Sequence, residues 1–214
     1  LTGGVKQLLK KNKVAYIEGE ARISKNLKVD VNNETYQAKD IILATGSQPF
    51  IPPIDGLDQV NYETTDTFFD LEKLPKQLAV IGGGVIATEL ASSMADLGVR
   101  VTIIEVADDI LLTEINETRE MLKAHLDNQG IKILTKAKIK QVKESKIILD
   151  GQDDVSFDTL LVATGRQPNT QVAKDLNLEM DGKFFKVNEH YETSQKHVYA
   201  IGAVSYTHLT LPTK

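Results

Sequence analysis

The chain of 214 residues contains no cysteine and no tryptophan, and aromatic residues make up only 6% of it. The absence of cysteine excludes a disulfide scaffold, a thiolate metal site and a cysteine nucleophile within these residues. No apolar run approaches the roughly 18 residues of a membrane-spanning helix, so we expect no membrane partner. The net charge is −5, without a basic stripe interleaved with aromatic residues, so we expect no nucleic-acid partner.

The hydrophobic content of 41% and the charged content of 26% are typical of a globular protein. A chain without cysteine suits the reducing cytoplasm, where we expect this protein to reside. Residues 1–13 lack both a signal-peptide pattern and an initiating methionine. We therefore expect the chain to begin inside a longer protein.

The most informative segment is 78–105, which reads LAVIGGGVIATELASSMADLGVRVTIIE. It predicts a strand, a glycine-rich turn, a helix and a second strand closed by an acid. Gly82 permits a sharp turn, Gly84 lets the backbone approach a pyrophosphate, and Ala87 lets the helix pack close to the sheet. The pyrophosphate would lie on the unpaired N–H groups at the start of that helix. The alternative is a glycine-rich turn in an ordinary βαβ unit that binds no ligand.

Glu105 completes this pattern, because it lies 23 positions after Gly82, where a carboxylate can accept hydrogen bonds from an adenosine ribose. A 2′-phosphate at this point would meet like charge, and Val106 and Ala107 offer no arginine to receive it. The alanine at position 87, the third glycine position of the motif, points the other way. We weight the charge above the methyl group, so the sequence favours NAD over NADP.

The rest of the chain predicts a doubly wound α/β domain over residues 74–165, with a β-rich region before it. Strands are expected at 14–23 and 27–31, and the prolines of 47–57 predict a connection between domains. Two buried helix faces are expected, formed by Ile86, Leu90, Met94 and Leu97 and by Met121, Leu122 and Leu126.

Two segments, IILATGSQP (41–49) and LLVATGRQP (160–168), mirror each other. Each contains an apolar strand, Ala-Thr-Gly, two residues and a proline. A shared turn geometry explains either copy alone, since glycine permits a positive φ and proline forces an exit. The pair also suggests that the stretch between them is inserted into another domain.

These segments, together with GGVKQLLKKNKVAYIEGEARI and VTIIEVADDIL, resemble the pyridine nucleotide-disulfide oxidoreductases, most closely the dihydrolipoyl dehydrogenases. Mercuric reductase and other flavin relatives share the pattern. The resemblance implies nested FAD- and NAD(P)-binding Rossmann-like domains, with parallel sheets and antiparallel β-meander excursions. It implies an FAD domain in two parts, at residues 1–73 and 166–204, with an NAD domain between them at residues 74–165. Residues 205–214 are expected to form a tail unlike the family.

The resemblance also assigns residues to the cofactors. It implies NAD contacts at Gly82, Gly83, Gly84, Val85, Ile86, Ala87, Glu89, Glu105, Ala137 and Gly165. It implies FAD contacts at Ala21, Thr45, Gly46 and Ser47. Glu89 would point toward the contact between flavin and nicotinamide, although an acid in the first turn of a helix is also favoured by the helix dipole.

The chain departs from the family in several places. The redox cysteine pair and the His–Glu proton-transfer pair are absent, so no catalytic residue is assigned apart from Glu89, and no metal site is expected. Ala203 stands where the family has an aspartate that holds FAD, and its methyl group cannot make charge-assisted hydrogen bonds. His125 is expected near a helix end, His190 and His197 are expected at the surface, and His208 is not the family's catalytic histidine.

The resemblance implies a fragment of an enzyme that oxidises dihydrolipoamide through a redox disulfide and FAD and transfers hydride to NAD⁺. Its implied partners are dihydrolipoamide or another dithiol or disulfide, a second copy in a homodimer, and a 2-oxoacid dehydrogenase complex. An NADH oxidase, a mercuric reductase or a coenzyme A disulfide reductase are alternatives. A dinucleotide-binding module without catalysis is a further one.

Overall fold

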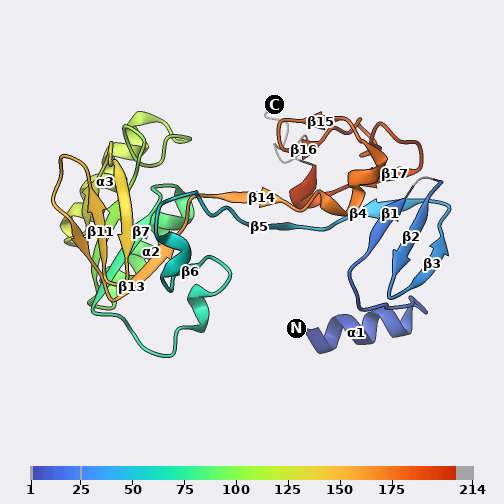
Figure 1. The fold of residues 1–214 in the computed structure, drawn as a ribbon, viewed down its shortest axis with the longest axis horizontal. Coiled ribbons are helices and arrows are strands. Elements are labelled where there is room, and N and C mark those ends of the chain that lie inside the picture. The colour runs from blue at the N-terminus through green and yellow to red at the C-terminus, as the bar shows by residue number, and fades with distance from the viewer. Residues whose placement is uncertain (1, 25, 206–214) are drawn as a thin grey trace. The chain divides into compact units, whose positions relative to one another are not determined.

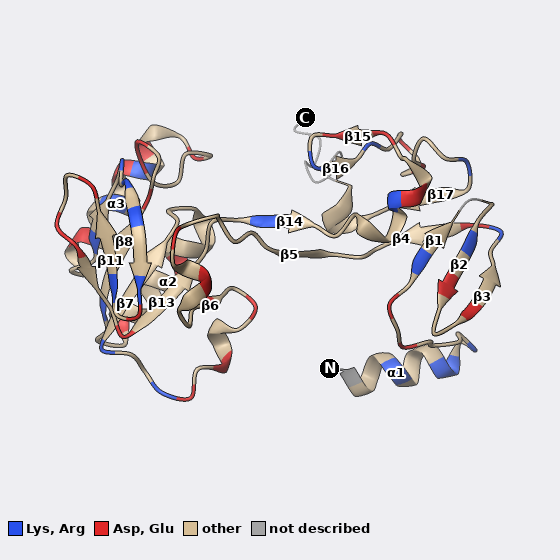
Figure 2. Cartoon of the chain, in the orientation of Figure 1, with Lys and Arg blue, Asp and Glu red and all other residues tan. Residues whose placement is uncertain are grey.

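The computed structural model describes residues 2–24 and 26–205 (Figure 1). The chain divides into two compact units. Unit 1 comprises Leu1–Ser47 and Pro168–Lys214, and unit 2 comprises Gln48–Gln167. Charges of both signs are interspersed over each unit (Figure 2).

Unit 2 is built on one parallel sheet with the strand order β6-β13-β7-β8-β9. Its strands are β6 (Glu63–Thr64), β7 (Gln77–Ile81), β8 (Arg100–Ile104), β9 (Lys132–Leu134) and β13 (Thr159–Val162). The strand β7 is apolar almost throughout because both of its faces are covered, as is usual in parallel sheets.

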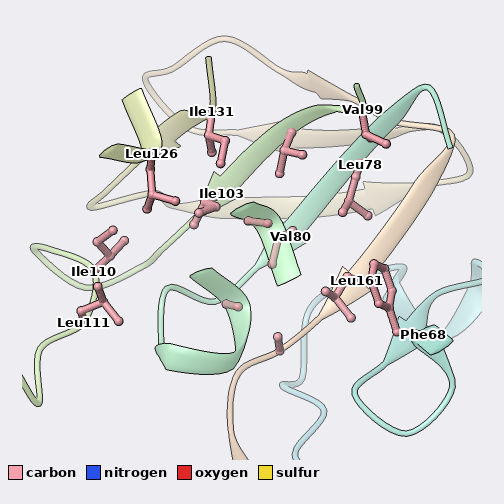
Figure 3. Close-up of a cluster of buried hydrophobic side chains, with 14 residues drawn as sticks. Phe68, Leu78, Val80, Val99, Ile103, Ile110, Leu111, Leu126, Ile131 and Leu161 are labelled. Carbon is pink, nitrogen blue, oxygen red and sulfur yellow. The ribbon is translucent and has the colours of Figure 1, made fainter. Parts of the chain in front are cut away.

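Different layers cover the two faces of this sheet. Leu78 and Val80 pack with helices α2 (Val85–Asp96) and α3 (Asn116–Asn128) (Figure 3). Ala79 and Ile81 point to the opposite face and pack with an antiparallel meander. The meander consists of β10 (Ile139–Lys143), β11 (Lys146–Leu149) and β12 (Val155–Ser156). The predicted parallel sheet and meander are therefore confirmed, whereas the second helical layer of a doubly wound domain is replaced by the meander.

The unit containing this sheet begins at Gln48, earlier than the predicted boundary at residue 74. The reason is that residues 48–73 pack on the sheet. Strand β6 pairs with β13, Leu57 is buried against the meander side, and Phe68 against the helix side. Two short 3-10 helices, η1 (Leu57–Gln59) and η2 (Phe68–Asp70), lie in this stretch.

Both predicted helix faces need correction. In α2 the fully buried residues are Ala87 and Ala91, whereas Ile86 and Leu97 are exposed and Leu90 and Met94 are only partly buried. Small side chains face the sheet because the helix lies close to it. In α3 Leu126 is buried as predicted, but Met121 and Leu122 are exposed.

Unit 1 contains several small sheets around its own core. Its elements are α1 (Thr2–Lys11), β1 (Arg22–Ser24), β2 (Lys28–Val31), β3 (Glu34–Gln37), β4 (Ile41–Leu43), η3 (Gln171–Leu176), β15 (Met180–Asp181), β16 (Phe184–Phe185), β17 (Val198–Ala200) and η4 (Gly202–Val204). Strands β1, β2 and β3 form an antiparallel meander, and β17 pairs with β4 in parallel. Ile23, Leu43 and Val198 belong to the core that these elements share.

The predicted strand at 14–23 is reduced to its end, because only Arg22–Ser24 forms a strand, which pairs with β2. The predicted strand at 27–31 is confirmed as Lys28–Val31. Asn32 and Asn33 form the tight turn after it, with φ angles of 52° and 63° that asparagine tolerates better than most residues. The two crossings between the units pair with each other as β5 (Ser47–Pro49) and β14 (Arg166–Pro168).

Candidate functional site

The glycine-rich turn after β7 is formed as the sequence predicted. Gly82 has a φ of 113°, and its N–H donates to the carbonyl of Ile104 at 2.9 Å. A Cβ at this position would lie 2.5 Å from the backbone oxygen of Ala163. Both the backbone angle and the close approach of β13 therefore require glycine here.

Gly83 is enclosed, for a reason that the sequence did not reveal. Its N–H donates to Oε2 of Glu105 at 2.6 Å, and its carbonyl accepts from the N–H of Leu111 at 2.8 Å. A Cβ on Gly83 would lie 2.7 Å from Cγ2 of Ile110 and 3.0 Å from the Glu105 carboxylate. The middle glycine is thus fixed by the segment that follows β8.

Gly84 and the first residues of α2 are open. A Cβ on Gly84 would meet no atom within 4 Å, and no side chain caps the start of the helix. The first N–H groups of an α-helix have no partner inside the helix, and together with the helix dipole they favour an anion. Val85 and Ile86 are exposed beside this opening. The geometry suits a phosphate group.

Glu105 lies directly after β8, and its carboxylate is oriented by two backbone donors. Oε2 accepts from Gly83, and Oε1 accepts from the N–H of Ala107 at 2.7 Å. An ionised carboxylate offers about four acceptor positions, so two remain for hydroxyl groups of a ligand. The acid therefore holds the glycine turn and keeps acceptor positions that suit the hydroxyl groups of a sugar.

Two other predicted residues lie near this edge of the sheet. The N–H of Ala137 donates to the carbonyl of Glu105 at 3.0 Å, and Ala137 is buried. Gly165 is exposed, with a φ of 110°, and it follows Ala163, whose N–H donates to the carbonyl of Ile81. The structure therefore brings together the turn, Glu105, Ala137 and Gly165 at the carboxyl ends of adjacent parallel strands, where such folds bind ligands.

Glu89 differs from its expected place in the helix. Helix α2 begins at Val85, so Glu89 is its fifth residue and lies beyond the first turn of about 3.6 residues. Stabilisation by the helix dipole at the first turn therefore does not explain this acid. Its side chain is exposed, and its role in the flavin–nicotinamide region stays a prediction.

The predicted FAD turn in unit 1 is held by a residue that the sequence did not single out. The hydroxyl of Thr45 donates to the carbonyl of Asn169 at 2.6 Å, and the Asn169 amide Nδ2 donates back to the carbonyl of Thr45 at 2.9 Å. The N–H of Asn169 also donates to the carbonyl of Gly46, whose φ is 68°. Ser47 begins β5, and Ala21 precedes β1 and is partly buried.

The mirrored turn in unit 2 uses the same bonds. The hydroxyl of Thr164 donates to the carbonyl of Phe50 at 2.7 Å, and the N–H of Phe50 donates to the carbonyl of Gly165 at 2.9 Å. Each Ala-Thr-Gly turn thus clamps the residue that follows the proline of the other copy. The sequence showed the repeat but not this reciprocal clamp.

The described histidines lie where they were expected, near the end of a helix or at the surface. His125 is exposed in the last turn of α3, and His190 is exposed in unit 1. His197 is also exposed, and its Nδ1 lies 2.9 Å from Oδ1 of Asp40. His208 lies outside the described residues.

Residues 2–24 and 26–205 contain no cluster of three or more His, Cys, Asp or Glu that could hold a metal ion. None of the helices described is both long enough and apolar enough to cross a membrane.

Comparison with known proteins decides the family. The profile of the family described as pyridine nucleotide-disulphide oxidoreductase matches residues 1–213. The chain belongs to this family. The match includes most of the tail predicted to be unlike the family, and residues 206–214 of that tail are outside the described part of the chain.

Members of this oxidoreductase family that resemble the chain have different names. The dihydrolipoyl dehydrogenase of Acholeplasma laidlawii is 38% identical over 213 residues, covering 96% of this chain and 63% of the relative. The mercuric reductase of Staphylococcus aureus is 35% identical over 202 residues, covering 88% of this chain and 36% of the relative. The chain therefore spans between about a third and two thirds of the length of these relatives.

Solved structures agree with this family. The HOCl-induced flavoprotein disulfide reductase RclA of Escherichia coli superposes with a TM-score of 0.82 at 27% identity, covering 94% of this chain and 50% of that one. The fold is thus that of the flavin-dependent disulfide reductases, and the family implies binding of FAD and of a pyridine nucleotide.

Proposed function

We propose that the chain is part of a dihydrolipoyl dehydrogenase. The observation that carries the proposal is the glycine turn at Gly82–Gly84, which opens onto the uncapped start of α2 beside the carboxylate of Glu105. These groups would hold the pyrophosphate and the adenosine ribose of NAD, and Ala137 and Gly165 would line the same edge. The similarity to dihydrolipoyl dehydrogenases at 38% identity supports the substrate.

In the whole enzyme the reaction removes two electrons and two protons from dihydrolipoamide, whose two thiols become a disulfide. A redox disulfide of the protein and bound FAD would supply the redox chemistry that links this oxidation to transfer of a hydride to NAD⁺, with release of a proton. This chain contains no cysteine, so its own contribution is to bind and orient the cofactors. We propose a cytoplasmic homodimer that serves a 2-oxoacid dehydrogenase complex.

The residues proposed for FAD fit that cofactor only in part. The turn at Thr45 and Gly46 is hydrogen-bonded to Asn169, and Ala21 and Ser47 complete the proposed contacts. Ala203 lies in η4 and offers no charged acceptor to the flavin. We therefore expect this chain to retain FAD weakly or not at all. A purified chain that is yellow and holds stoichiometric flavin would contradict this expectation.

The preference for NAD follows from the charge on Glu105. Titration of NADH and NADPH into the chain, followed by nicotinamide fluorescence, is expected to show tighter binding of NADH. Replacement of Glu105 by glutamine removes the charge and also leaves the N–H of Gly83 or of Ala107 without its carboxylate acceptor. The lost acceptor affects both nucleotides, whereas the lost charge affects their ratio, and we expect the preference for NADH over NADPH to fall about tenfold, equivalent to roughly 1.4 kcal/mol. Absence of binding by either nucleotide would overturn the proposed site, and a preference for NADPH would overturn the proposed role of Glu105.

A second candidate is another disulfide reductase of the family, such as a mercuric reductase, and the 35% identity to one such enzyme favours it. An NADH oxidase, a coenzyme A disulfide reductase and a dinucleotide-binding module without catalysis are further alternatives. Sequencing of the natural transcript on both sides of these residues separates them. A redox cysteine pair upstream would support a disulfide reductase, and its absence would support the module.

A further inference from the structure

The loop between Glu105 and α3 contacts the glycine turn directly. Leu111 has a φ of 55°, and its N–H donates to the carbonyl of Gly83 at 2.8 Å. Ile110 is fully buried, and its Cγ2 approaches the Cα of Gly83 so closely that a Cβ there would be 2.7 Å away. Figure 3 shows Ile110 and Leu111 next to each other at the edge of the buried cluster. The position of Gly83 therefore depends on the position of this loop.

Asp109 anchors the loop to α3. Its Oδ1 accepts from the N–H of Ile110 at 2.9 Å, and its Oδ2 accepts from Nη1 of Arg119 at 3.3 Å. Nζ of Lys123 lies 3.2 Å from Oδ1. The side chains of Asp109 and Arg119 are only 19% and 17% exposed, so solvent screens this pair less than an ordinary surface pair.

The two cations of α3 are themselves held in place. Arg119 donates to the side chain of Asn116, and Lys123 donates to Oε1 of Glu120 at 3.1 Å. These bonds restrict both long side chains before they meet Asp109. The anchor is thus a network that begins on one helix and ends at the backbone of Ile110.

The protonation of Asp109 agrees with this network. Burial is the largest single influence on its pKa and disfavours the charged form. The hydrogen bonds from Ile110 and Lys123 and the positive charges of α3 oppose it, and together they hold the pKa of Asp109 below its ordinary value. Asp109 is therefore a carboxylate at neutral pH.

We propose that Asp109 is a positioning residue for the pyridine nucleotide. Through Ile110 and Leu111 it holds Gly83, and Gly83 in turn places the N–H groups of the glycine turn that would receive the pyrophosphate. Asp109 acts without touching the ligand, since its oxygens bind Ile110 and the cations of α3. The inference rests on the proposed function of the site.

Asp108 provides a matched control for Asp109. The two acids are adjacent, but the Asp108 side chain is 86% exposed and faces Lys136 at a distance of 3.8 Å. Substitution of either acid by asparagine removes one negative charge from the same loop. The long-range electrostatic effect on an anionic nucleotide is therefore similar in the two variants. A difference between them in nucleotide affinity then measures the effect of the hydrogen bonds and ion pairs of Asp109.

The test compares NADH binding by the unmodified chain, Asp109→Asn and Asp108→Asn, at a temperature where circular dichroism shows all three to be folded. We expect Asp109→Asn to bind about tenfold more weakly than Asp108→Asn, corresponding to the lower range for one charge-assisted hydrogen bond. Hydrogen exchange of the peptide containing residues 82–87, measured without nucleotide, is expected to accelerate in Asp109→Asn and to stay unchanged in Asp108→Asn.

The outcomes separate the two claims. Equal affinity and equal exchange in both variants, with binding by the unmodified chain, would overturn the role of Asp109 and leave the proposed site intact. Faster exchange without a difference in affinity would also overturn the role, because the anchor would then support the fold alone. If the unmodified chain does not bind NADH, the proposed function fails, and with it the role of Asp109 toward a nucleotide.

Discussion

The two units of this protein contain the same Ala-Thr-Gly turn but differ in what surrounds it. In unit 2 the turn at Gly165 lies at the edge of a five-stranded parallel sheet, beside a glycine loop and the start of a helix. In unit 1 the turn at Gly46 follows a two-stranded parallel pair. Unit 1 also exposes large hydrophobic side chains near its N-terminal end, at Val5, Leu8 and Tyr16.

This difference separates the structural role of the turn from the binding of a nucleotide. Both turns make the same clamp through the threonine hydroxyl and the glycine carbonyl. The groups suited to a pyrophosphate are the open Gly84 and the uncapped helix after it, and these accompany only the copy in unit 2 among the described residues. We infer that unit 2 carries the stronger nucleotide site of this chain.

The largest expected effect is on the stability of unit 2. Gly82→Ala would place a Cβ against the Ala163 oxygen at a φ of 113°, and we expect it to lower the free energy of unfolding by about 3 kcal/mol. Gly46→Ala is the matched change in unit 1, where the space is open and the φ of 68° costs about 1 kcal/mol. Hydrogen exchange in peptides of each unit, recorded as a function of urea concentration, measures the stability loss of both variants. Equal losses would show that the close approach at Gly82 is unimportant.

A smaller effect is expected on binding alone. Gly84 has a φ of −79°, and a methyl group added there would meet open space. The variant Gly84→Ala should therefore keep its free energy of unfolding within about 0.5 kcal/mol. The methyl group would obstruct a pyrophosphate, and we expect the dissociation constant for NADH to rise about tenfold. Calorimetric titration and thermal unfolding of the same sample check the two parts. Unchanged affinity would mean that the ligand does not approach Gly84.

The hydrogen-bond clamps of the two turns are expected to differ slightly in how much they stabilise their units. Thr164→Val removes the bond to Phe50 and should destabilise unit 2 by about 1 kcal/mol. Thr45→Val should cost unit 1 less, because the amide of Asn169 still donates to the backbone of residue 45. Hydrogen exchange in each unit measures the two costs. A larger loss in Thr45→Val would contradict the stabilising role assigned to the Asn169 amide.

The smallest effect concerns pH. Because the pKa of Asp109 is lowered in the folded state, its ion pairs stabilise the protein above the ordinary value of 3.8 and lose this contribution as the pH falls through 3.8 and below. The stability difference between the unmodified chain and Asp109→Asn should therefore be constant near neutral pH and shrink below about pH 4. Urea denaturation between pH 3 and 7 checks this, and a difference that grows with acid would contradict the sign.

The sequence predicted the parts of the site that lie close together in the chain. Gly82, Gly84 and Glu105 lie within one βαβ unit, where the spacing reflects local geometry, and the turn and the acid lie together as predicted, while their contacts with a nucleotide stay a prediction. The clamp between Thr45 and Asn169 was not predicted, because it joins residues 124 positions apart. The network of Asp109 was also missed, since no periodicity marks a loop residue that is paired with a helix.

The buried faces of the helices show a second limit. Hydrophobic periodicity assigned Ile86 and Leu97 to the core, but α2 lies close to the sheet and its fully buried residues are Ala87 and Ala91. In α3 the side of the helix that meets Asp109 includes Arg119 and Lys123. Because these residues are charged, hydrophobic periodicity cannot identify this side. At both helices, tertiary packing therefore decides which residues are buried, and hydrophobic periodicity does not.

The most direct test of the account is to map NADH on the chain by amide chemical shifts. The central claim is that the N–H groups from Gly83 to Ala87 receive the pyrophosphate and that Glu105 receives the ribose. We expect saturable shifts of the amides of residues 83–87 and of Ala107, whose N–H bonds to the Glu105 carboxylate. Binding of NADH that leaves these amides unchanged and shifts residues elsewhere would contradict the claim.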